Sequence, residues 1–284
     1  MKLLRYGAKG QERPAMLDAE GHMRDLSSHV ADITSDVLAA ERLQQLAQLD
    51  PASLPRVDGN PRLGAPVNGI GKIIAIGLNY RSHAEETGAA PRAEPLIFSK
   101  AITALSGPND PIMIPKGSTA TDWEVELAVI IGSVTRYVDE DQALDHVAGY
   151  TIINDVSERS FQRERGGQFI KGKSADTFAP LGPWLVTSDE IPDPQKLALW
   201  LDLNGKRRQE ASTADMIFPV AYLINHVSQF MTLMPGDVIA TGTPAGVGLG
   251  CKPPEYLKPG DTLELGVEGL GRQRQDVIAH PEQS

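Results

Sequence analysis

The sequence contains little cysteine, few aromatic residues and no long apolar run. Its single cysteine, Cys251, cannot form a disulfide within the chain, which fits a reducing compartment. No segment approaches the roughly 20 consecutive apolar residues of a membrane-spanning helix. The first residues, 1–6, lack the pattern of a secretion signal. We therefore expect a cytoplasmic protein that has no membrane partner.

A basic surface is also lacking. The chain has 27 Lys and Arg against 37 Asp and Glu, which gives a formal net charge of -10. Nucleic acid is therefore not an expected partner. An anionic substrate would need local lysine, arginine or a metal ion to offset the overall repulsion. The 41% hydrophobic and 23% charged residues are ordinary for a globular protein and allow a sizeable core.

The first 65 residues predict a small N-terminal domain. Strands are expected at 2–6 and 15–18, and the apolar spacing of 35–49 predicts a helix. Proline and glycine are frequent from 51 to 69, which indicates a linker. A catalytic domain is expected over 70–284.

Residues 70–284 carry many short apolar runs bounded by glycine or proline, which predict strands. The expected strands are 72–77, 125–131, 149–154, 199–203, 237–241 and 262–267. A helix is expected at 218–230, with Pro219 in its first turn. Because few helices separate these strands, the pattern favours a strand-rich α+β domain over a doubly wound sheet.

Three acidic residues flank two of the expected strands. Glu124 and Glu126 alternate at the start of one apolar strand, so their side chains project from the same face. Asp155 ends the second apolar run, and two strands that end together would bring it to the glutamates. Adjacent buried carboxylates repel, and Mg²⁺ or Mn²⁺ would relieve that repulsion through oxygen ligands. A pair of solvated glutamates on an edge strand is the alternative.

His83 and Glu86 follow the strand expected at 72–77. In a helical turn the two side chains share a face, and a carboxylate-held histidine can take a proton from water. The alternative is a surface histidine beside acidic residues. Glycine and prolines in the segment 87–95 are typical of a mobile loop that covers a site.

Two glycine-rich stretches resemble phosphate-binding loops in composition. Residues 167–174 satisfy the pattern G-x-x-x-x-G-K-S, but that loop needs a strand before it and a helix after it. The charged lead-in 158–165 and the prolines at 180 and 183 oppose both requirements, so we expect no nucleotide binding. Lys173 stays of interest as a positive charge for an anionic substrate. Glycines in 241–248 could admit a carboxylate close to backbone N–H groups, or simply form a tight loop.

Taken together, five segments in this order resemble the fumarylacetoacetate hydrolase family. They are GLNYRSHAEE (77–86), DWEVEL (122–127), NDVSER (154–159), KGKSADTFAPLGP (171–183) and TGTPAGVG (241–248). The resemblance implies a mixed β-sandwich roll with a small N-terminal domain, usually assembled as a homodimer. The family's prototypes have one more acidic metal ligand, for which this sequence has no clear counterpart.

The resemblance also implies roles for individual residues. Glu124, Glu126 and Asp155 match the ligands of Mg²⁺ or Mn²⁺, and His83 with Glu86 matches a water-activating pair on a lid. The remaining matches are the active-site lysine, Lys173, and substrate-contacting positions, namely Tyr80, Arg81, Arg159, Gln162 and Thr243.

The activity implied is hydrolysis of a carbon–carbon bond in a ketonic substrate, a small 2,4-diketo acid that carries a 2-keto acid group. The opening MKLLRYG and the length resemble the sugar-acid group of the family. Its substrates would be 2,4-diketo-3-deoxy-L-fuconate or L-rhamnonate, giving pyruvate and lactate. The alternatives are an acylpyruvase, an oxaloacetate decarboxylase, a diacid decarboxylase-isomerase, or a non-catalytic carboxylate-binding protein on the same fold.

Overall fold

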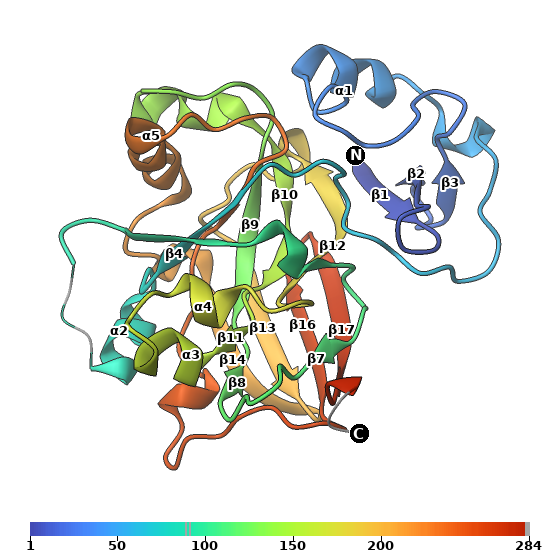
Figure 1. The fold of residues 1–284 in the computed structure, drawn as a ribbon. Helices are drawn as coiled ribbons and strands as arrows, with labels where there is room; N and C mark the ends of the chain where they lie inside the picture. The colour runs from blue at the N-terminus through green and yellow to red at the C-terminus, as the bar shows by residue number, and fades with distance from the viewer. Residues whose placement is uncertain (89, 91, 282–284) are drawn as a thin grey trace.

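A computed structural model of the chain describes residues 1–284 except 89, 91 and 282–284. Two large sheets and a few short helices make up the molecule (Figure 1). In the larger, ten-stranded sheet the order is β3 (Met23–Asp25), β2 (Arg13–Leu17), β1 (Lys2–Tyr6), β12 (Ala179–Thr187), β10 (Val147–Asn154), β9 (Val125–Ile131), β15 (Val238–Ala240), β4 (Ile73–Gly77) and β5 (Leu96–Lys100), with β6 (Leu105–Ser106) paired to β12. The β15–β4 and β12–β6 pairs are parallel.

The second sheet has five strands, in the order β14 (Lys206–Ser212), β13 (Ala198–Leu203), β16 (Thr262–Val267), β17 (Gly271–Ile278) and β7 (Ile112–Met113). A further pair joins β8 (Thr121–Asp122) to β11 (Ser157–Glu158). Strands β13 and β16 lie close to β9, and β17 lies close to β10 and β12. The two sheets therefore face each other across a shared core.

The helices are α1 (Ala40–Ala47), α2 (Arg81–Thr87), α3 (Arg159–Glu164), α4 (Ile170–Lys173) and α5 (Val220–Phe230). Short 3-10 turns occur at Pro51–Ser53, Ile102–Ala104, Glu140–His146, Ser188–Glu190, Thr213–Asp215 and Gly248–Gly250. Helices α2, α3 and α4 lie together on one side of the larger sheet (Figure 1). Across the described residues, no helix is long and apolar enough to cross a membrane.

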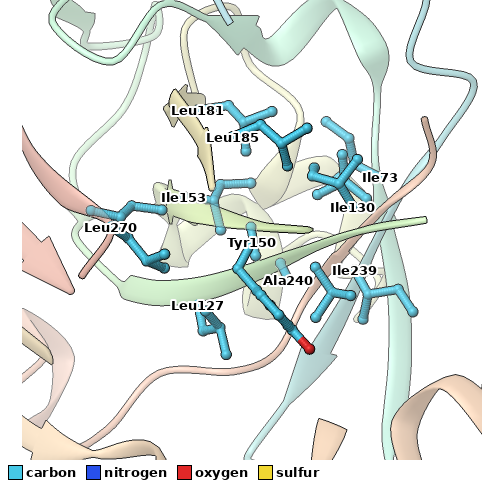
Figure 2. Packing of buried hydrophobic residues seen from close by; sticks show 14 of the residues in the cluster. Ile73, Leu127, Ile130, Tyr150, Ile153, Leu181, Leu185, Ile239, Ala240 and Leu270 are labelled. Carbon is cyan, nitrogen blue, oxygen red and sulfur yellow. The ribbon is translucent and has the colours of Figure 1, made fainter. Parts of the chain in front are cut away.

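The core is centred on β9 and β10, which are buried along their whole lengths. Such strands read as continuous apolar runs because both faces of the sheet are covered. Figure 2 shows labelled side chains from β4, β9, β10, β12 and β15 gathered around them, among them Leu127, Tyr150 and Leu185. This packing fixes the positions of the polar residues at the ends of both strands.

Buried glutamines join the two sheets. Gln273 of β17 donates from its amide nitrogen to the backbone oxygens of Ile152 and Gly182, each at 2.9 Å. Gln209 of β14 accepts from the Val125 N–H at 3.0 Å. Buried backbone groups need hydrogen-bond partners. These side-chain amides of the second sheet supply such partners to backbone groups of the larger sheet.

The expected strand-rich α+β fold is confirmed, while several boundaries differ. The helix expected over 35–49 begins only at Ala40, because Ala39 has an extended backbone and turns occupy the preceding residues. Strand β1 pairs with both β2 and β12, so the N-terminal strands extend the larger sheet. The division of the chain between residues 65 and 70 stays a prediction.

Leu265 lies in β16 with no exposed surface, so Leu265→Ala should lower the free energy of unfolding by about 2–5 kcal/mol. The matched change Leu144→Ala, at a side chain that is 39% exposed, should cost about 0.5 kcal/mol or less. Urea unfolding of both variants measures the difference. Equal losses would show that the second sheet does not share the core described above.

Candidate active site

Two neighbouring strands bring the three predicted carboxylates together. Glu126 of β9 lies opposite Ile153 of β10, and the Asp155 N–H donates to the Glu124 backbone oxygen at 2.9 Å. Carboxylate oxygens of Glu124, Glu126 and Asp155 all lie within 4.8 Å of one another, and all three residues are buried. The alternation along one strand and the shared end of two strands therefore produce the expected cluster.

Cationic side chains compensate two of these carboxylates. Lys173 Nζ donates to Glu124 Oε2 at 2.6 Å and to Asp155 Oδ2 at 2.7 Å. Arg159 Nη2 donates to Glu124 Oε1 at 2.6 Å. Burial alone would raise the pKa of Glu124, but Arg159 and Lys173 outweigh it and hold this pKa below its usual range. Glu124 is therefore ionised in the folded protein.

Glu126 differs from its two neighbours. Its carboxylate accepts the Gly242 N–H at 2.7 Å, and it forms no ion pair with a described residue. Burial raises its pKa well above the usual value, and the charges of Asp155 and Glu124 raise it further. A divalent cation would remove this penalty, and oxygen donors suit Mg²⁺ or Mn²⁺. The three carboxylates therefore fit such an ion.

Lys100 belongs to this cluster although the sequence did not single it out. Its ammonium group is fully buried in β5 and donates to Asp155 Oδ1 at 2.5 Å and to the Val156 backbone oxygen at 3.1 Å. Burial lowers the pKa of Lys100 to about 8, although the charge of Asp155 opposes the shift. A lysine that ends an apolar strand is usually solvated, so the sequence around Lys100 did not indicate a buried role for it.

Asp122 is a second missed residue. It is fully buried, and its carboxylate accepts hydrogen bonds from Arg159 Nε at 2.8 Å, from the Gly248 N–H at 2.7 Å and from the Leu249 N–H at 3.0 Å. It therefore links the arginine to the glycine-rich loop. The alternation of Asp122, Glu124 and Glu126 would have indicated it.

Part of this charged cluster lines a cavity of about 340 Å³. His83, Glu124, Glu126, Arg159, Gln162, Lys173 and Thr243 contribute polar side chains to its wall. Ile76, Leu78, Phe98, Phe169 and Leu249 contribute apolar ones. A cavity of this size with convergent polar groups suits a small molecule.

Helix α2 places His83 at this cavity. His83 Nδ1 lies 3.4 Å from Glu86 Oε2, and Glu86 Oε1 accepts the Gly246 N–H at 2.9 Å. A Cβ at Gly250 would lie 2.1 Å from the Glu86 carboxyl carbon, so a larger residue there would displace this carboxyl group. Thr87 and Gly88 also line the cavity. The lid expected over 87–95 stays a prediction, and residues 89 and 91 lie outside the described residues.

The structure does not bring every expected residue to the cavity. Tyr80 is fully buried, its hydroxyl has no partner among the described residues, and it is absent from the cavity wall. Arg81 is exposed and lines a separate groove with Glu85 and Asp215. Arg81 and His83 lie two residues apart in α2, so their side chains point to different sides of the helix.

Thr243 lines the cavity, but its hydroxyl already donates to the Val125 backbone oxygen at 2.9 Å. The context of the phosphate-loop pattern at 167–174 is the reverse of what that loop requires. Helix α3 precedes it and strand β12 follows it. Lys173 instead lies at the end of α4, where it contacts the carboxylates.

Comparison with known proteins gives a family match and a close sequence relative over almost the whole chain. The sequence model described as "Fumarylacetoacetate (FAA) hydrolase C-terminal" matches residues 72–278. A candidate hydrolase of Burkholderia lata, whose name gives no substrate, is 59% identical over 276 residues, which are 97% of this chain and 98% of the relative.

Solved structures with the same fold include three named enzymes. The fumarylacetoacetate hydrolase of Exiguobacterium antarcticum has a TM-score of 0.88 and 38% identity, covering 99% of this chain and 100% of that one. A probable 2-hydroxyhepta-2,4-diene-1,7-dioate isomerase of Mycobacterium abscessus has a TM-score of 0.84 and 34% identity, covering 99% of both chains. The maleylpyruvate hydrolase of Sphingobium sp. SYK-6, solved with manganese(II) and pyruvate, has a TM-score of 0.82 and 29% identity, covering 98% of this chain and 99% of that one.

Glu126→Gln replaces the carboxyl group that has no cationic partner among the described residues with an amide that cannot ionise, so it should weaken Mn²⁺ binding. Changing groups that only support a ligand already costs about 10–100-fold in affinity, and a direct ligand should cost at least as much. Calorimetric titration with Mn²⁺ measures the loss.

The control for this titration is Asp18→Asn, in a second acidic group formed by Asp18, Glu20 and His22. Asp18 already accepts bonds from Arg24 and two backbone N–H groups, so Mn²⁺ affinity should not change. Unchanged affinity in Glu126→Gln, or a loss only in Asp18→Asn, would refute the site.

Proposed function

We propose that this protein is a divalent-metal-dependent hydrolase of a 2,4-diketo acid. The chain belongs to the fumarylacetoacetate hydrolase family. One observation carries the proposal. Three buried carboxylates lie within 4.8 Å of one another, one of them without a cationic partner, and two of them, Glu124 and Glu126, line a cavity with His83 and Lys173. The Sphingobium hydrolase, solved with manganese(II) and pyruvate, supports a metal and a 2-keto acid as ligands.

The residues divide into three groups by their contacts. Glu124, Glu126 and Asp155 would hold Mg²⁺ or Mn²⁺, which would supply Lewis acidity toward the 2-keto acid group. Lys173 lies against two of these carboxylates and lines the cavity, so its charge can offset negative charge that develops on the substrate.

His83 is the proposed general base. It takes a proton from water, and Glu86 holds the imidazole in place through Nδ1. The water oxygen bonds to C4 of the substrate, the C3–C4 bond breaks, and its electron pair stays on C3. C3 then accepts a proton, which yields pyruvate and a carboxylic acid.

The Mycobacterium abscessus protein, described as an isomerase, supports a second candidate activity on the same fold. Neither an isomerase nor a decarboxylase needs an attacking water. The contact of His83 with Glu86 at the cavity favours hydrolysis, because a carboxylate-held imidazole is suited to remove a proton from water. A 3-deoxy sugar acid as the substrate stays a prediction from the sequence.

Pyruvate release from 2,4-diketo acids tests this function. Activity should appear with Mg²⁺ or Mn²⁺, disappear in excess EDTA and return when the metal is restored, because the carboxylates alone supply no electrophile. A coupled pyruvate assay over a panel of diketo acids makes the measurement. Full activity in EDTA would rule out the metal-dependent mechanism.

His83→Ala should lower kcat by about 10²–10⁴-fold, the usual contribution of general-base catalysis, while Mn²⁺ affinity stays near the wild-type value. Residues that act as a unit are non-additive, so adding Glu86→Ala to His83→Ala should change kcat little further. A double-mutant cycle on kcat, with metal affinity measured in parallel, provides the test.

Three results of this cycle would count against the assignment. If the two losses multiply, the residues act independently. If His83→Ala abolishes Mn²⁺ binding, the imidazole is a ligand. If neither change affects hydrolysis, another group activates the water.

A further inference from the structure

We propose that Arg163 binds a second, distal carboxylate of the substrate and thereby selects dicarboxylic over monocarboxylic 2-keto acids. The inference rests on the proposed function, since it names the substrate class of the same cavity. It assigns a specificity role to a residue outside the sequence motifs discussed above.

The first support is the geometry of α3. Arg159, Gln162 and Arg163 all line the cavity. They are spaced i, i+3 and i+4, which places them on one face of a helix. Arg159 contacts the carboxylate cluster through Glu124. Arg163 lies four residues further along, a rise of about 6 Å, and its residue is exposed while Arg159 is buried. One face of α3 therefore contributes two cations to the cavity wall, and only Arg159 is bound to the carboxylate cluster.

The second support is charge. Arg159 is engaged with Asp122 and Glu124, and Lys173 with Glu124 and Asp155. Arg163 makes no hydrogen bond or ion pair to any residue in the described part of the chain. Nearby cations do have partners: Arg165 lies 4.2 Å from the centre of the Phe161 ring, and Lys171 donates to the Arg165 backbone oxygen. Arg163 is therefore the cavity cation left for a ligand.

The third support is the apolar part of the cavity wall. Leu78, Phe98, Phe169 and Leu249 line the cavity with apolar side chains. A polyol chain would lose hydrogen bonds to water against such a wall, whereas methylene or unsaturated carbons would not. A guanidinium matches the planar fork of a carboxylate better than it matches scattered hydroxyls. In a chain with net charge -10, an unpaired arginine also offsets the repulsion of a dianion.

These points together describe the ligand. One end is a 2-keto acid at the carboxylate cluster, the middle is apolar, and the far end is a carboxylate at Arg163. The cavity of about 340 Å³ is of a size that suits such a small diacid. The inference favours a diacid over the sugar acid that the N-terminal sequence suggested.

Two substrates of equal chain length provide the kinetic test, namely 2,4-dioxoheptanedioate and 2,4-dioxoheptanoate, assayed with Mn²⁺. The wild-type protein should have the higher kcat/KM on the diacid. A hydrogen-bonded ion pair contributes about 1.5–3 kcal/mol, so Arg163→Leu should lower the diacid/monoacid ratio by about 10–100-fold. Arg163→Lys should restore part of the ratio, because the charge remains but the fork is lost. Arg165→Leu is the matched control on the same segment and should leave the ratio unchanged.

A binding measurement separates this inference from the proposed function. The ligands 2-ketoadipate and 2-ketohexanoate match in length and lack the 4-keto group, so neither can be cleaved. Calorimetry on the Mn²⁺-loaded protein should show tighter binding of the diacid, and Arg163→Leu should abolish the preference.

The outcomes are distinguishable. If no diketo acid is cleaved but the Arg163-dependent preference for 2-ketoadipate persists, the hydrolase proposal fails and the role of Arg163 stands. If cleavage occurs but wild type shows no diacid preference, or Arg163→Leu retains it, the role of Arg163 is overturned. If Arg165→Leu loses the preference as fully as Arg163→Leu, the effect belongs to the general surface charge and the inference also fails.

Discussion

The mutual repulsion of three carboxylates within 4.8 Å is the constraint on which the rest of this site depends. In a buried environment that repulsion is weakly screened. Lys100 from β5, Arg159 from α3 and Lys173 from α4 each supply a compensating cation. Ion pairing therefore fixes how these three elements meet the ends of β9 and β10, and the cavity is the space left between them.

Much of the larger sheet could be predicted, because strands buried on both faces read as plain apolar runs. Strands β9 and β10 follow that rule closely. Strand β17 does not, since its inward positions include Gln273, which donates to the Ile152 backbone oxygen of β10, and Gln275, which accepts from the Asn154 side chain of the same strand. Strand β12 contains Pro180 and Pro183, which conceal it in the sequence. Local sequence patterns therefore do not reveal a strand that contains proline, or a strand whose inward polar residue bonds to a distant part of the chain.

The same distinction separates the site residues that could be predicted from those that could not. Glu124 and Glu126 are detectable because one strand's alternation puts them on one face. The pairing of Lys100 with Asp155 spans 55 residues, and nothing near Lys100 in the sequence indicates that its partner is a carboxylate. Tyr80 and Arg81 were assigned to the substrate only through the family resemblance, and neither side chain lies on the cavity wall, so that assignment stays a prediction.

Gly250 has a consequence for how the site can vary. Its backbone is one that any residue can adopt, so loop geometry alone would accept a side chain there. The obstacle is the Glu86 carboxyl group, 2.1 Å from where a Cβ would stand. A side chain there would displace the Glu86 carboxyl group, which is the movable end of its side chain, and would break the hydrogen bond that this carboxyl accepts from the Gly246 N–H. His83 would then lose the contact at its Nδ1. The neighbouring glycine-rich loop also donates to Glu126 through Gly242 and to Asp122 through Gly248, so it contacts both the base and the carboxylate cluster. Variation at this one position therefore acts first on the orientation of the base.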